Sequence, residues 1–204
     1  MTHIAEARAR PYRSQLRAQQ AEETRERILE ATVRVMARGL ASVSIPAVAR
    51  EASVSVPTVY RHFGTKRDLL AALRPYFVRR AGLDELVPPR SVAEVRDFLH
   101  WNFERLESLD DLARVALASP AAEEVRQVDT PGRLGMTRRF ADTIAPDLPE
   151  RDRDRIARLL VVLTSSSALR VWRDHLGSSV DETADDLEWV LSLAIATGPS
   201  RGAG

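Results

Sequence analysis

The segment 44–70 carries the signals of two short helices joined by a tight turn, and it constrains the fold more than any other part of the chain. Ser44 and Ser55 each stand two residues before a proline, an arrangement typical of an N-cap followed by a first helical turn. The pattern predicts one helix that ends near Ala52 and a second helix over about 56–62. Two short helices separated by so few residues form a helix-turn-helix.

The residues at the predicted helix crossing are small or apolar. Ala49 allows the two helices to approach closely, and Val48, Val54 and Val59 supply apolar contacts beneath them. In a helix-turn-helix, the outer face of the second helix is then free to reach base edges and phosphates in a DNA groove. An ordinary helical hairpin shows the same pattern, so the pattern alone leaves both interpretations open.

Helices are also predicted on either side of this segment. Over about 22–38, apolar residues lie on one side of a helix with a rotation of about 100° per residue, and charged residues lie on the other. Thr65 and Asp68 form a capping box at the start of a fourth helix. Pro75 predicts a kink or a restart in that helix, because proline removes a backbone hydrogen bond.

Charge is distributed unevenly along the chain. Residues 1–67 hold 12 Arg and Lys against 6 Asp and Glu, whereas residues 68–204 hold 18 against 23. The N-terminal third is therefore basic and the remainder acidic. This division predicts one module that binds a polyanion and a second module with another task.

Several classes of protein are excluded by composition. The chain has no cysteine, so it has no disulfide, thiolate metal site or cysteine nucleophile. Its four histidines stand at no metal-binding spacing, and it has no glycine-rich phosphate loop or nucleophile elbow. No apolar run approaches the roughly 20 residues that span a membrane, and no secretory signal is present. We therefore expect a cytoplasmic protein without enzyme activity, metal or cofactor.

The rest of the chain also reads as helical, so we predict an all-α fold. The punctuating prolines and glycines predict helices at about 91–107, 110–118, 120–127, 131–144, 150–175 and 181–197. The predicted domains are a flexible basic arm (1–20), a helix-turn-helix DNA-binding domain (21–67) and a helical effector-binding and dimerisation domain (68–204). The arm has a second possible role, in which it reaches DNA, but a disordered tail is the favoured interpretation.

The run from Pro57 to Lys66 closely resembles the signature of the tetracycline-repressor (TetR) family of bacterial transcriptional regulators. The matching positions are Val54, Ser55, Thr58, Val59, Tyr60, His62, Phe63, Thr65, Lys66 and Leu69, together with Thr24, Arg25, Ile28 and Leu29 in the first helix. One departure is Ser53, where the family usually has glycine. The resemblance covers 22–70 and implies three DNA-binding helices, a connecting fourth helix, and a helical domain for ligand binding and dimerisation.

The resemblance also implies roles for individual residues. Thr58 and Tyr60 would contact phosphates or bases, His62 would lie against the DNA backbone, and Lys66 would pair with a phosphate at a helix N-terminus. Arg61 and Val56 occupy variable positions and are the expected specificity residues. The full set of expected DNA-binding residues is Ser44, Ser55, Val56, Thr58, Tyr60, Arg61, His62 and Lys66.

Two further sites are expected in the C-terminal domain. The expected effector-binding residues are Trp101, Glu104, Met136, Phe140, Leu169 and Trp172. The alternative interpretation is that these residues pack in the core of the domain. The expected dimer residues are Leu160, Leu163, Thr164, Ser167, Leu187, Val190, Leu191 and Ala194. The small residues at 164–168 would allow either a partner helix or a ligand to approach closely.

Together these features predict a homodimeric regulator that binds operator DNA and is most often a repressor. A small, largely apolar effector would bind the C-terminal domain and release the protein from DNA. The sequence does not distinguish repression from activation. The competing class is a helical interaction protein without DNA binding.

Overall fold

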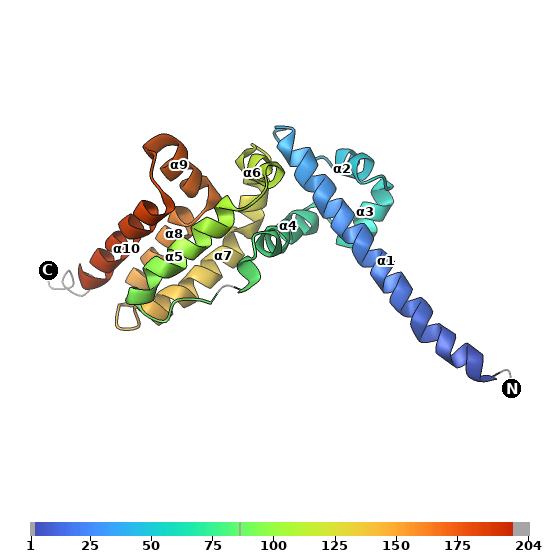
Figure 1. The fold of residues 1–204 in the computed structure, drawn as a ribbon, viewed down its shortest axis with the longest axis horizontal. Coiled ribbons are helices and arrows are strands. Elements are labelled where there is room, and N and C mark those ends of the chain that lie inside the picture. Colours follow the sequence, from blue (N-terminus) through green and yellow to red (C-terminus); the bar gives the residue numbers. More distant parts are fainter. Residues whose placement is uncertain (1–2, 86, 198–204) are drawn as a thin grey trace.

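The structure is a computed structural model that describes residues 3–85 and 87–197, and these residues form an all-α fold (Figure 1). Its helices in the N-terminal part are α1 (His3–Ala37), α2 (Ile45–Glu51), α3 (Val56–Phe63) and α4 (Lys66–Arg80). Two short 3-10 helices follow, η1 (Leu83–Glu85) and η2 (Val92–Glu94). The remaining helices are α5 (Val95–Glu107), α6 (Asp111–Ala118), α7 (Ala122–Ile144), α8 (Glu150–Leu163), α9 (Ser166–Leu176) and α10 (Val180–Thr197).

Two apolar cores hold these helices together. The first core combines side chains of α1–α4 with side chains from α6 and the first turn of α7. The second core lies among α5, α8, α9, α10 and the C-terminal half of α7. The apolar core of the helix-turn-helix unit therefore extends across the predicted domain boundary between residues 67 and 68.

Helix α1 is much longer than the predicted helix at 22–38, since it begins at His3. In Figure 1 it extends as a rod away from the rest of the molecule. The residues of 3–21 are mostly Ala, Arg, Gln and Glu, which have high helix propensity even without an apolar face. Residues 3–20 of the predicted arm are thus helical in the structure, and contact of the arm with DNA stays a prediction.

The structure corrects two predicted helix boundaries at prolines. Helix α4 runs without a break through Pro75, and α7 runs through Pro131, where separate helices at 120–127 and 131–144 were expected. A proline removes one hydrogen bond, whereas α4 buries apolar side chains both before and after Pro75. In α7, the hydroxyl of Thr130 donates to the carbonyl of Arg126 at 2.7 Å, which supports the turn before Pro131.

The helix predicted over 150–175 is in fact two helices, α8 and α9. Helix α8 ends at Leu163, and the hydroxyl of Thr164 donates to the carbonyl of Leu160 at 2.7 Å. Ser165 then caps α9 by accepting the backbone N–H of Ala168 at 3.1 Å. The run of small residues is therefore a helix end followed by a helix start, because serine and threonine side chains satisfy the unpaired backbone groups.

Candidate nucleic-acid interface

The turn between α2 and α3 has the predicted geometry. Ser53 has a φ of 55°, a left-handed conformation that glycine adopts more easily than serine. The backbone N–H of Val54 then donates to the carbonyl of Ala49 at 2.9 Å and closes the turn. Serine at position 53 therefore adopts a left-handed conformation, and the turn closes with it in place.

Helix α2 is held against α1 by a buried face and by one carboxylate. Ile45, Val48 and Ala49 are buried, and Glu51 accepts from the Nε of Arg34 at 2.9 Å and also pairs with Arg38. These hydrogen bonds lower the pKa of Glu51, chiefly through Arg34. Such pairing fixes the helix that supports α3.

Helix α3 has one buried face and one free face. Val59 and Phe63 are buried in the first core, whereas Tyr60 is 44% exposed and Arg61 is also exposed. Val56, Thr58 and His62 are half-buried at the edges of the same helix. In Figure 1, α2 and α3 lie at the opposite end of the molecule from α9 and α10, so α3 stands clear of the C-terminal helices.

The two serines in the expected set have structural positions at helix starts. Ser55 is the N-cap of α3 and accepts the backbone N–H of Thr58 at 3.2 Å, and its hydroxyl also shares a 2.9 Å hydrogen bond with the Thr58 hydroxyl. Ser44 precedes α2 but makes no side-chain cap hydrogen bond to any residue that the structure describes. Ser55 is therefore engaged in capping, and the hydroxyl of Ser44 is the less constrained of the two.

Lys66 is the first residue of α4, which follows α3 in the sequence after two residues. The predicted capping box is present: Thr65 accepts the N–H of Asp68 at 3.1 Å, and Asp68 accepts the N–H of Thr65 at 3.2 Å. The ammonium of Lys66 pairs with Glu124 of α7 at 2.9 Å. Sequence reasoning missed Glu124, because its position 58 residues away leaves no local signal.

Arg25 of α1 is a second residue that sequence reasoning did not assign to this site. Its Nη1 donates to the carbonyl of His62 at 3.1 Å, and its guanidinium lies 4.2 Å from the centroid of the Phe63 ring. Burial, and then the positive charges of Arg61 and Arg25, lower the pKa of His62 below its usual 6.5, against a smaller opposing effect of Glu22. Burial and these two cations therefore favour the neutral form of His62.

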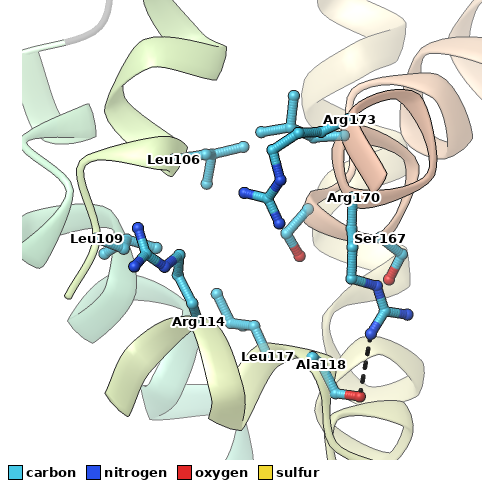
Figure 2. A pocket seen from close by; sticks show the side chains of 10 residues that line it. Leu106, Leu109, Arg114, Leu117, Ala118, Ser167, Arg170 and Arg173 are labelled. Atoms are coloured by element: carbon cyan, nitrogen blue, oxygen red, sulfur yellow. Dashed lines mark hydrogen bonds between the residues drawn. The ribbon is translucent and has the colours of Figure 1, made fainter. Parts of the chain in front are cut away.

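A small open pocket lies between the C-terminal end of α5, α6 and α9 (Figure 2). Its cavity volume is about 50 Å³, and it is open to solvent. The lining residues are Leu106, Leu109, Arg114, Leu117, Ala118, Ser166, Ser167, Leu169, Arg170 and Arg173. Figure 2 shows Arg173 of α9 reaching into the pocket, whereas Arg114 of α6 lies beside Leu109. Leucines form the apolar part of this pocket, and three guanidinium groups border it.

Of the expected effector-binding residues, this pocket contains only Leu169. Phe140 is buried and packs against Phe98 with ring centroids 4.6 Å apart, and Trp172 packs against the second core. Trp101 lies beneath the guanidinium of Arg105, Glu104 is exposed, and Met136 contacts Arg74. Phe140 and Trp172 thus belong to or contact the second core, whereas Trp101 is half-buried beside Arg105.

The expected dimer residues lie in several different environments of the subunit. Leu160, Leu187 and Leu191 are buried in the second core, where they pack within the chain. Leu163 packs against that core, Thr164 caps the end of α8, Ser167 lines the pocket, and Val190 and Ala194 are half-buried. The exposed large apolar residues on the same two helices are Leu159 and Val162 of α8 and Trp189 and Leu193 of α10. An amphipathic pattern identifies an apolar face but does not say whether it packs within the chain or against another chain.

Residues 3–85 and 87–197 show neither a metal-binding cluster nor a membrane-spanning helix. Within those residues no cluster of three or more His, Asp and Glu side chains could hold a metal ion. None of the helices described there is long and apolar enough to cross a membrane.

Comparison with known proteins agrees with this geometry. Residues 28–73 match the family model described as bacterial regulatory proteins of the tetR family. The chain is 32% identical over 189 residues to the HTH-type transcriptional repressor KstR of Rhodococcus jostii (strain RHA1), covering 88% of this chain and 86% of that one. It is 30% identical over 192 residues to KstR of Mycolicibacterium smegmatis, covering 90% and 93% of the two chains.

A solved structure also resembles the whole fold. NalD of Pseudomonas aeruginosa, described as the secondary repressor of the MexAB-OprM multidrug efflux pump, superposes with a TM-score of 0.56 at 19% sequence identity. The match covers 91% of this chain and 100% of NalD. The likeness extends through the C-terminal helices, beyond the segment that the family model matches.

Proposed function

The chain belongs to the TetR family of DNA-binding transcriptional regulators, and on that premise we propose that it is a repressor whose α3 lies in the major groove of operator DNA. The observation that carries this proposal is the free face of α3, with Tyr60 and Arg61 exposed and Val59 and Phe63 anchored beneath. Lys66 and the basic N-terminal third supply the charge that attracts phosphates. Because its target is chromosomal DNA, its place of action is the cytoplasm.

Repression, rather than activation, is supported by the names of the relatives. Both KstR proteins and NalD are described as repressors, and the KstR matches extend over most of each chain. A bound repressor needs only to occupy its operator, so the DNA-binding unit and a dimer are sufficient for this activity. The runner-up is a helical interaction protein that does not bind DNA.

The repressor is proposed to act as a two-fold dimer. Two recognition helices must enter successive major grooves about 34–36 Å apart, which one copy of α3 cannot do. Exposed Leu159, Val162, Trp189 and Leu193 on α8 and α10 supply the apolar surface for such a contact. These four residues replace Leu160, Leu187 and Leu191 in the proposed interface.

The proposed effector site is the pocket between α5, α6 and α9. Its leucines suit an apolar body, and Arg114, Arg170 and Arg173 suit an anionic group, so the ligand class is an amphipathic anion. Helix α6 also packs against α1, so a ligand between α6 and α9 contacts a helix that supports the DNA-binding unit. A ligand that binds this pocket more tightly in the DNA-free state would release the operator.

DNA binding is tested by fluorescence anisotropy with duplexes from the chain's own upstream region, compared with a scrambled duplex. We expect preference for one upstream duplex and an affinity that falls steeply with salt. Tyr60→Phe and Lys66→Ala are expected to weaken binding without unfolding the protein. Absence of binding to every duplex would favour the interaction protein instead, and equal affinity for all duplexes would contradict a sequence-specific repressor.

The effector site is tested with a matched pair of probes, decanoate and decanol. Decanoate is expected to raise the melting temperature more than decanol does, and Arg170→Gln is expected to remove that preference. Arg170 suits this test because it pairs with no carboxylate among the residues described and bonds only the carbonyl of Ala118, at 3.4 Å. Equal effects of both probes would argue against an anion-binding pocket.

A further inference from the structure

One carboxylate of the C-terminal domain contacts the DNA-binding unit at two places. The Oε2 of Glu124 lies 2.9 Å from the ammonium of Lys66, and its Oε1 accepts from the same ammonium at 3.1 Å. The backbone N–H of Val43 also donates to Oε2, at 3.3 Å. Val43 stands directly before the N-cap of α2, and Lys66 begins α4. Glu124 therefore bridges the two flanks of the helix-turn-helix.

The Lys66–Glu124 pair is open to solvent. The side chains are 37% and 30% exposed, so a change of partner requires only side-chain rotation. Arg67, the next residue, is exposed and pairs with no carboxylate in the part of the chain that the structure describes. Of these two adjacent cations at the start of α4, only Lys66 forms an ion pair with a carboxylate among the residues described.

A carboxylate and a phosphate oxygen compete for the same ammonium group, because each satisfies its N–H donors with a negative charge. In the proposed function, Lys66 pairs with a phosphate of the duplex. A phosphate placed at Lys66 also lies close to Glu124, and the two anions repel each other. The free protein and the DNA complex thus place different anions at one cation.

We propose that Glu124 is an internal competitor for DNA: its carboxylate holds Lys66 in the free protein, and a backbone phosphate replaces it on binding. The inference rests on the proposed function and adds Glu124 as a positioning residue that acts through Lys66. Because the exchange is reciprocal, any change that draws α7 away from Lys66 favours the duplex, and the duplex favours release of α7.

The test uses Glu124→Gln and a short mixed-sequence duplex, since phosphate contacts do not depend on sequence. Glutamine keeps an oxygen that accepts the N–H of Val43 but has no charge to hold Lys66. Anisotropy is measured from about 50 to 200 mM salt. We expect binding roughly 1.5- to 5-fold tighter for each subunit, the range of a solvent-exposed ion pair. We expect the salt slope to stay unchanged, because a phosphate contacts Lys66 in both complexes and the number of phosphate contacts is the same.

Two controls separate this exchange from a general change in charge. Glu123→Gln removes a negative charge from the neighbouring position of α7, where Glu123 pairs with Arg126, and should leave affinity and slope unchanged. In the Lys66→Gln background, Glu124→Gln should no longer tighten binding, because its partner is absent. A purely structural role of Glu124 would not make the effect of Glu124→Gln depend on the presence of Lys66.

The possible outcomes are distinguishable. Weaker or unchanged binding by Glu124→Gln, or equal tightening in the presence and absence of Lys66, would overturn the competition. Tightening by Glu123→Gln of the same size would also overturn it, because the effect would then be long-range charge. If the unmodified protein binds no duplex even at low salt, the proposed function itself fails, which is a separate result.

Discussion

Arg25 of α1 holds the last turn of α3 through a 3.1 Å hydrogen bond from its guanidinium to the carbonyl of His62. The last carbonyls of a helix have no partner within that helix, so Arg25 satisfies a group that would otherwise face water or an apolar surface. The same guanidinium covers the ring of Phe63, which anchors α3 in the first core. One side chain therefore fixes both the end and the anchor of the recognition helix.

We expect Arg25→Ala to lower the free energy of unfolding by about 1–2 kcal/mol, since it removes a charged hydrogen bond and a cation–π contact. Affinity for a mixed-sequence duplex should also fall, because α3 is held less firmly. Urea titration and anisotropy measure the two effects. Arg27→Ala removes the same charge from an exposed position of α1 and should change stability by less than about 0.5 kcal/mol. Equal effects of the two variants would show that the contact with α3 is unimportant.

Ser53→Gly is expected to stabilise the protein by about 0.5–1 kcal/mol. The left-handed backbone conformation at position 53 strains serine but not glycine. The free energy gained by relieving this strain exceeds the cost of the added conformational entropy of glycine in the unfolded chain. The reverse change is available at Gly39, which has a φ of 74° and open space around it, so Gly39→Ala should destabilise by about 1 kcal/mol. Thermal or urea unfolding checks both. A destabilised Ser53→Gly variant would mean that the serine side chain has a structural role.

The helix-turn-helix was predictable because its signals are local. Ser55 and Thr65 cap helices within three residues of themselves, and Gly64 ends α3 with a positive φ. Each of these signals acts within one turn of backbone, so a single sequence contains all the necessary information. The same locality misled at Pro131, where a strong breaker signal was outweighed by a long helix packed at both ends.

The contacts between distant segments were not predictable in this way. Arg25 and His62 are 37 residues apart, and the residues of the pocket come from α5, α6, α9 and the loops beside them. Neither relationship has a period or a spacing that one sequence displays. The apolar face of α10 was correctly read as apolar, but whether Leu187 or Trp189 faces the core depends on how α10 packs on α5 and α8.

His62 makes stability depend on pH. Its pKa is lower in the folded protein than in the unfolded chain, where it is near 6.5, so the unfolded chain binds more protons between these two values. The contribution of His62 to stability is therefore complete above about pH 6.5 and is lost as pH falls through this interval. We expect the difference in unfolding free energy between the unmodified protein and His62→Gln to shrink between pH 7 and pH 5.5. A difference that stays constant would show that His62 has the same pKa in both states.

Trp189→Glu is expected to separate the proposed dimer without unfolding the subunit. Trp189 is 66% exposed on α10 and is therefore not part of the subunit core, but in a two-fold dimer the new carboxylate would be buried without a partner. Light scattering coupled to gel filtration should give a monomer mass. Affinity for an operator duplex should fall by roughly 100-fold, because the second half-site is no longer bound in the same molecule.

Leu40→Glu is the matched control for this substitution. Leu40 is also a large exposed apolar residue, but it lies in the loop between α1 and α2 and not on α8 or α10. It should leave the dimer mass unchanged. If Trp189→Glu also remains a dimer with unchanged DNA affinity, the contact between subunits does not use this face of α10. If both variants dissociate, the dimer depends on a surface that includes the DNA-binding unit, and the interface proposed on α8 and α10 is wrong.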